Sequence, residues 1–102
     1  MKLLIEVEFP NHAGNAMVKS GQIERVQGIL QEHKAEAPHF MAKNGHRFLQ
    51  YFVDVTDAAK LPFYAEPWWL IAEGKVTATV VMAAQDFGKA QPDIQAAAKK
   101  YG

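Results

Sequence analysis

The stretch Asn44–Val55, NGHRFLQYFVDV, decides the fold of this chain. It opens with an Asn-Gly pair, and both residue types tolerate the positive φ angles of a two-residue type I′ turn, the strongest short signal for a β-hairpin. The residues that follow are rich in aromatic and β-branched types, which is typical of a strand. The sequence therefore predicts a hairpin whose turn is Asn44-Gly45 and whose second strand reaches Val55.

This second hairpin strand carries apolar side chains on both of its faces. Side chains alternate between the faces along a strand, so residues of like parity share one side. We expect one row to pack on the core: Leu49, Tyr51, Val53 and Val55. The opposite row is His46, Phe48, Gln50, Phe52 and Asp54, and the hairpin register adds His39, Met41 and Lys43 to that open face.

Upstream of the hairpin, the sequence predicts a strand over Lys2–Phe9, in which apolar residues alternate with Glu6 and Glu8. A helix is expected to follow, starting at Asn11 or Ser20 and running to about Lys34. One apolar stripe marks it: Ile23, Val26, Leu30 and His33. Three glycines spaced seven apart (14, 21 and 28) lie opposite this stripe. They indicate a late start or a kink, or else close approach by the tail or a second subunit.

Downstream, helical signals are interrupted by prolines. After a short hairpin strand at His39–Lys43, a second helix is expected from Thr56 or Asp57 to near Glu73, with Gly74 as its C-cap. Pro62 and Pro67 interrupt it, which predicts a kink or two short helices. A β-branched strand, 75–83, comes next. The tail, 84–102, begins polar and is expected to close with a short helix from residue 92.

The predicted order of elements is β-α-β-β-α-β, which is the ferredoxin-like pattern of the α+β class. It implies a four-stranded antiparallel sheet of order 4-1-3-2 with two helices on one face. We expect a single domain over residues 1–83, followed by the C-terminal tail, residues 84–102.

Composition excludes several classes of protein. The chain has 102 residues, of which 49% are apolar, and its formal net charge is zero, so neither a disordered chain nor a nucleic-acid binder is expected. It has no cysteine, and its histidines lack metal-ligand spacing, so no metal or cofactor is expected. Early glutamates argue against a signal peptide, and no apolar run approaches a membrane span. We expect a cytoplasmic protein with no membrane partner.

Several short motifs suggest a family. The first strand ends in Phe9-Pro10, an acidic turn follows the third strand, and an apolar-x-x-aromatic-x-x-x-Trp pattern is matched by Leu61, Tyr64 and Trp68. On these motifs residues 1–83 resemble an uncharacterised bacterial family of the dimeric α/β-barrel superfamily. The resemblance implies a homodimer in which two sheets close into a barrel. Relatives in that superfamily include cofactor-independent monooxygenases, isomerases and stress-related proteins.

Three hypotheses compete for the open face of the sheet. In the first it is a dimer interface anchored by Met41, Phe48 and Phe52, since a monomer rarely leaves such a patch exposed. In the second it binds a small molecule through Glu6, His39 and Gln50. The third is RNA binding, which the glutamates on this face and the neutral net charge disfavour. As catalytic candidates, His39 or His46 near Glu6 could act as a general base. The alternative is that the histidines are surface or interface residues.

The aromatic stretch LPFYAEPWWLIAEG, residues 61–74, is the second concentrated signal. Its side chains either pack on the sheet, or Tyr64 and Trp68 line a ligand pocket with Tyr51 below them. The overall expectation is a binding protein for a small aromatic or lipophilic molecule, with cofactor-independent oxygenase or isomerase chemistry as an extension. The alternative is a structural or regulatory homodimer without catalysis. Whether the protein is an enzyme stays open.

Overall fold

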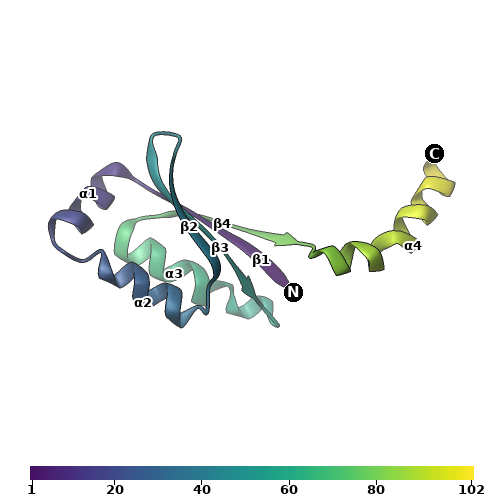
Figure 1. The fold of residues 1–102 in the computed structure, drawn as a ribbon, viewed down its shortest axis with the longest axis horizontal. Coiled ribbons are helices and arrows are strands. Elements are labelled where there is room, and N and C mark those ends of the chain that lie inside the picture. Colours follow the sequence, from purple (N-terminus) through teal and green to yellow (C-terminus); the bar gives the residue numbers. More distant parts are fainter.

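A computed structural model describes all 102 residues and shows an α+β fold around one antiparallel sheet (Figure 1). The strands are β1 (Lys2–Phe9), β2 (Glu36–Lys43), β3 (His46–Asp54) and β4 (Lys75–Val81). Their order across the sheet is β2-β3-β1-β4, which is the predicted order read from the other edge. The ferredoxin-like arrangement expected from the sequence is therefore consistent with the structure.

The β2–β3 hairpin forms as the Asn-Gly signal predicts. Asn44 and Gly45 have φ angles of 56° and 76°, which are those of a type I′ turn. Lys43 faces His46 across the strands, and the predicted register holds along the hairpin. Only the start of β2 differs from expectation, because the strand begins at Glu36 and reaches its register through an irregularity before residue 39.

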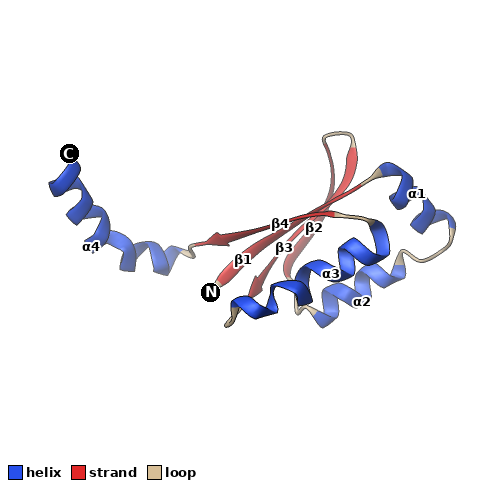
Figure 2. Ribbon diagram, turned by 180° about the vertical axis from the view of Figure 1, so that it is seen from behind, coloured by secondary structure: helices blue, strands red, loops and turns tan.

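Helices α2 (Glu24–Glu32) and α3 (Leu61–Ala72) lie along one face of the sheet (Figure 2). A further helix, α1 (Asn11–Lys19), lies at the end of the strands, where the sequence predicted a single helix before the hairpin. The sequence predicted one helix up to residue 34 with a late start or a kink, and this stretch divides into α1 and α2 because α1 ends in a Schellman motif. Gly21 takes a left-handed φ of 73°, and the Gln22 N–H donates to the Met17 carbonyl at 3.0 Å. This geometry ends a helix, and glycine adopts it without steric cost.

The core lies between these helices and the inward-facing rows of the sheet, as the strand parity predicted. Fourteen buried residues form one cluster: Leu3, Ile5, Val7, Phe9, Met17, Val26, Leu30, Leu49, Tyr51, Val53, Val55, Tyr64, Trp68 and Ala72. Burying a large apolar side chain contributes about 1.5–3 kcal/mol, so this cluster supplies most of the favourable free energy of folding.

Helix α3 is continuous, and the predicted break at its prolines was wrong. A single 3₁₀ turn, Ala58–Lys60, precedes it, and the Asp57 carboxylate accepts from the Ala59 N–H at 2.9 Å. Pro62 lies in the first turn, where a missing N–H costs nothing. At the other end Glu73, with a φ of 50°, takes the left-handed cap position expected for Gly74.

Pro67 lies in the middle of α3 and removes the helical hydrogen bond to the carbonyl of Phe63, four residues earlier. His33, directly after α2, replaces that bond: its Nε2 lies 2.9 Å from the Phe63 oxygen. Because a carbonyl oxygen only accepts, Nε2 carries the proton. The expectation that the histidines are surface or interface residues is wrong for His33, which is only 3% exposed.

The other nitrogen of this ring continues a chain of hydrogen bonds through the core. Since Nε2 holds the proton of the neutral ring, Nδ1 of His33 accepts from the Tyr51 hydroxyl at 2.8 Å. The Tyr51 oxygen accepts in turn from Trp68 Nε1 at 2.9 Å. The polar atoms of three buried side chains are thus satisfied, and the chain joins α2, α3 and β3.

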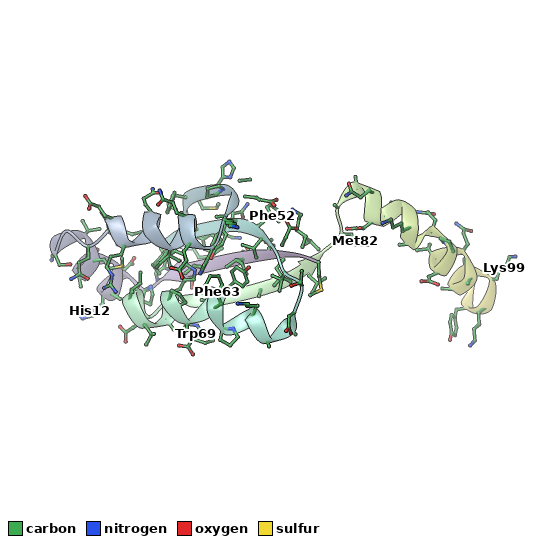
Figure 3. All side chains as sticks on the ribbon, turned by 90° about the horizontal axis from the view of Figure 1, so that it is seen from below. His12, Phe52, Phe63, Trp69, Met82 and Lys99 are labelled. Atoms are coloured by element: carbon green, nitrogen blue, oxygen red, sulfur yellow. The ribbon has the colours of Figure 1, made fainter.

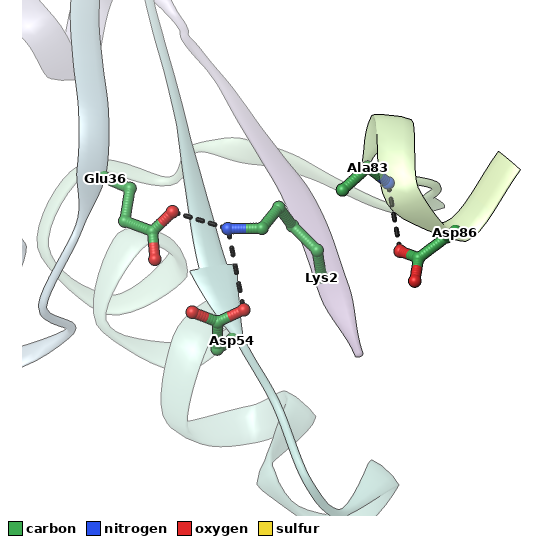
Figure 4. A network of polar contacts seen from close by, with 5 residues as sticks. All are labelled: Lys2, Glu36, Asp54, Ala83 and Asp86. Carbon is green, nitrogen blue, oxygen red and sulfur yellow. Dashed lines mark hydrogen bonds and ion pairs between the residues drawn. The ribbon is translucent and has the colours of Figure 1, made fainter. Parts of the chain in front are cut away.

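The tail forms a fourth helix, α4 (Ala84–Tyr101), which projects away from the body (Figure 1). Met82 marks where it leaves the sheet, and Lys99 lies near its far end (Figure 3). The expected helix from residue 92 was eight residues too short, because Asp86 caps an earlier start. Its carboxylate accepts from the Ala83 N–H at 3.0 Å (Figure 4). No residue of α4 is buried.

None of the four helices combines the length and the apolar character needed to cross a membrane.

We predict that the stability of the fold decreases as the pH is lowered below about 6.5. Burial lowers the pKa of His33 from its ordinary value of 6.5, so the unfolded chain takes up a proton at a pH where the folded one resists it. The unfolded state therefore binds more protons between the two pKa values, and the free energy of unfolding falls as the pH falls through that window.

Urea denaturation at about pH 7.5 and about pH 5.5, on either side of this ordinary pKa, measures the effect. Wild type should lose more stability between the two than His33→Gln, and the exposed-site control His12→Gln should behave as wild type. Equal losses in all three proteins would show that His33 does not carry the pH dependence.

Candidate functional site

A groove of about 880 Å³ lies between α1, the beginning of α2 and the β2–β3 hairpin. Fourteen residues line it, and eight of them are apolar. The apolar ones are Phe9, Met17, Ile23, Val26, Phe40, Met41, Ala42 and Phe48. We call this hollow the hairpin groove.

The hairpin groove exists because α1 and α2 are separate helices. The Schellman turn places the start of α2 away from the end of α1, so Val26 is buried while Ile23 is 49% exposed. On the opposite wall Phe40 is 55% exposed, although edge strand β2 places it on the side of the sheet that carries the helices. Two large apolar side chains are left facing water across the hollow.

A polar corner of the hairpin groove is built around Arg47, at the start of β3. Its Nη1 donates to the Asn15 side-chain oxygen at 3.0 Å. The guanidinium lies against α1 at Gly14, where an added Cβ would stand 2.9 Å from Nη1. The Asn11 amide donates to the Gly45 carbonyl at 3.3 Å. These contacts hold the first two turns of α1 against the hairpin.

The charges around the hairpin groove are of one sign. Its polar lining residues are Asn11, Asn15, His46 and Arg47, and no aspartate or glutamate is among the fourteen. The nearest acidic contact of the lining is Glu8, whose Oε1 lies 3.9 Å from His46 Nδ1. That nitrogen is buried and has no hydrogen-bond partner.

On the open face of the sheet, the glutamates lie near basic side chains. Lys43 Nζ lies 3.9 Å from Glu6 Oε2, and His46 lies near Glu8. A second, polar hollow of about 150 Å³ is lined by Glu6, Glu8 and Lys43 together with residues of β4. At one end of this face, Lys2 contacts both Glu36 and Asp54 (Figure 4).

The candidate catalytic residues do not form one constellation. His39 donates from Nδ1 to the Ala37 carbonyl at 2.8 Å. In the sheet it faces Gln50, which in turn faces Glu6, so a whole strand separates His39 from Glu6. His46 contacts Glu8 rather than Glu6. No group of three histidine, aspartate or glutamate side chains has a geometry that could hold a metal ion.

The four candidate ligand-binding residues lie in two places. Tyr51, Tyr64 and Trp68 belong to the core, and the first and third are 0% exposed, which leaves them no surface for a ligand. Burial raises the pKa of Tyr51 far above its ordinary value, so its hydroxyl stays protonated. Gln50 lies on the opposite face of the sheet, facing Glu6.

The three candidate dimer residues do share one surface. Met41 faces Phe48 across the hairpin, and Phe52 faces Leu4 of the central strand. Phe48 is 8% exposed within a single chain, with the Lys43 ammonium 4.7 Å from its ring centroid. Met41 and Phe52 are partly exposed, so an apolar strip runs across the open face.

Residue patterns alone did not identify Arg47 and Asn15 as site residues. The signals that exist are indirect: Ile23 belongs to the predicted apolar stripe, and Gly14 is one of the glycines for which close approach was considered. Within the single chain the contact at Gly14 comes from Arg47 and not from the tail.

No protein-family model, curated protein or solved structure matches this chain. Its function must therefore be argued from the arrangement of its own residues.

Proposed function

We propose that this protein binds a small aromatic or lipophilic molecule in the hairpin groove. The observation that carries the proposal is a hollow of about 880 Å³ with eight apolar lining residues. Ligand sites for small organic molecules have volumes of roughly 300–1,000 Å³, mostly apolar walls and a few convergent polar groups. The polar hollow on the open face, at about 150 Å³, is too small for such a ligand.

Exposure of the groove walls supports the same proposal. Ile23 and Phe40 are about half exposed in the single chain. Polar residues at these two positions would not disturb the core. A ligand seated between them removes apolar surface from water, which contributes about 25 cal/mol per Å². Occupation of the groove therefore stabilises the fold as well as the complex.

Binding is better supported than catalysis. A general base must reach the proton that it abstracts, and the lining of the hairpin groove holds one histidine and no carboxylate. That histidine, His46, contacts Glu8 on the open face of the sheet. Cofactor-independent oxygenase or isomerase chemistry would therefore have no base inside the groove.

Filling the groove should abolish binding. Ala42 lines the groove from β2, and Ala42→Trp should lower the affinity for the neutral apolar dye Nile red by at least roughly tenfold, a loss of about 1.4 kcal/mol. Ala78→Trp is the matched control, because Ala78 is exposed on the other edge strand, β4, and lines neither hollow. Dye fluorescence titrations measure both. Equal affinities of the two variants would move the binding site elsewhere.

A second candidate function is that of a structural or regulatory homodimer, and the size of the exposed surface favours it. The chain exposes 6950 Å², whereas a compact monomer of 11.4 kDa exposes about 5,800 Å². Its radius of gyration is 17.1 Å, against about 13 Å for a compact chain of this length. The excess surface exceeds the roughly 800 Å² that each partner buries in an interface of standard size.

Two surfaces account for that excess. One is the apolar strip of the open sheet face, and the other is α4, whose Phe87 is 53% and Ile94 43% exposed. No residue of α4 is buried, and Gly88 and Pro92 weaken the helix. A second copy provides cover for both, because two-fold symmetry places like faces together. Face-to-face sheets of two copies would form the α/β barrel that the sequence resemblance implies.

The dimer is tested by a charge on the open face. Phe52→Asp should reduce the mass in light scattering from about twice 11.4 kDa to a single chain, because a buried unpaired carboxylate is strongly unfavourable. Leu70→Asp, on the outer side of α3 where Leu70 is 79% exposed, should leave the dimer intact. A wild-type protein that stays a stable monomer at high micromolar concentration contradicts the dimer.

A further inference from the structure

We infer that the ligand of the hairpin groove is an apolar molecule with a carboxylate at one end, and that Arg47 holds this carboxylate. The inference rests on the binding function proposed above and adds the chemical class of the ligand. It follows from the position, the unused hydrogen-bonding capacity and the surroundings of a single guanidinium group.

The first observation is the position of the Arg47 side chain in the groove. Arg47 faces Phe9 on one side and Ala42 on the other in the sheet register, and all three residues line the hairpin groove. The guanidinium therefore stands at one end of an apolar hollow. Gly14 makes room for it, because a Cβ at that position would lie 2.9 Å from Nη1. The α1 backbone and the Asn15 side chain thus give the charged group a defined place.

The second observation is that most N–H donors of Arg47 have no partner in the chain. A guanidinium has five N–H donors and can hold a carboxylate through two parallel hydrogen bonds. Arg47 uses one nitrogen, Nη1, toward Asn15. No carboxylate lies within 4.0 Å of it, whereas Lys2 and Lys43 of the same sheet both have acidic neighbours. The donors that remain are free for a ligand.

The third observation is the character of the residues that line the groove around Arg47. The groove lining contains no acidic residue, so an anion entering it meets no like charge there. Six of the eight apolar lining residues remain for the body of the ligand, because the side chains of Met41 and Phe48 lie on the open face of the sheet. An uncharged polar molecule would leave those walls without complement, and a purely apolar one would leave the guanidinium without an acceptor. An amphiphilic acid complements both parts.

Helix α4 of a second copy fits the same hollow less well. Its sequence carries Asp86 and Asp93 but also three lysines, 89, 99 and 100, so its net charge has the same sign as the guanidinium. Charge complementarity therefore favours a small acid over the helix. The experiment below separates these two occupants.

The probes are 1-naphthaleneacetate and 1-naphthaleneacetamide, which have nearly the same shape and differ in charge. Fluorescence titration of the full chain should give a roughly threefold lower Kd for the acetate, as expected for an ion pair at an exposed arginine. Arg47→Gln should bind the two probes with equal affinity, and a cooperative urea denaturation transition shows that the variant is folded. Arg25→Gln, which removes the other arginine of the chain, should keep the preference.

Ionic strength gives a second measurement that needs no variant, since raising the salt concentration should reduce the preference for the acetate and leave acetamide binding almost unchanged. Equal binding of both probes by wild type, or an undiminished preference in Arg47→Gln, would overturn the assignment of the carboxylate while the binding function stands. Binding of neither probe would overturn both. In that case the mass in solution of Ala42→Trp is compared with that of wild type. A mass half as large would identify a second copy of the chain as the occupant of the hairpin groove.

Discussion

The hydrogen bond from His33 to the Phe63 carbonyl is the constraint on which the helical layer depends. Pro67 deprives that carbonyl of its helical partner, and a buried unpaired carbonyl costs about 1–3 kcal/mol. The imidazole supplies the missing donor from a different helix, at 2.9 Å. A defect in the backbone of α3 is thereby converted into a tertiary contact that fixes the end of α2 against α3.

The same contact sets the protonation pattern of the core. With Nε2 committed to the carbonyl, the other ring nitrogen accepts from Tyr51, whose oxygen accepts from Trp68. Each polar atom in this chain has one partner of the right kind, and a second proton on the ring would place two donors against the Tyr51 oxygen. Buried networks of this kind are stable only when every member is satisfied. A neutral His33 is therefore a condition of the native packing.

The hairpin groove follows from how α2 is held. Its C-terminal end is fixed to α3 and the sheet through His33, while its N-terminal end follows the left-handed turn at Gly21. Val26 reaches the core, but Ile23, one turn earlier, does not. The helix thus leaves the sheet toward the hairpin, and the hollow opens there. Arg47 enters this hollow because Gly14 of α1 leaves room for it.

Local signals in the sequence were sufficient for the sheet. Asn44-Gly45 predicted the hairpin and its register, and the alternation along β1 and β3 predicted which face would be buried, because both properties depend on neighbouring residues alone. The helices were harder to predict. The left-handed conformation of Gly21 could not be recognised, because its seven-residue spacing from two other glycines suggested one helix face. Pro67 indicated a break, because the residue that replaces its missing N–H, His33, lies 34 positions away along the chain.

The candidate site was the least predictable part. Tyr51 and Trp68 suggested a pocket because they belong to a concentration of aromatic residues beside the sheet, yet both are buried and their polar atoms bond to one another. Arg47 carried no local signal, since its surroundings are created by α1, α2 and β2 together. Sequence patterns thus gave the scaffold and the apolar residues, whereas the position of the free cation required the tertiary arrangement.

The most direct test of this account is a double-mutant cycle of His33→Leu and Pro67→Ala, with unfolding free energies measured by urea denaturation. In wild type, His33→Leu leaves the Phe63 carbonyl and the Tyr51 hydroxyl without partners. In the Pro67→Ala background the helix supplies its own N–H to that carbonyl, so the same substitution should cost about 1–2 kcal/mol less. Equal costs of His33→Leu in the two backgrounds would contradict the claim that the imidazole replaces the bond lost at Pro67.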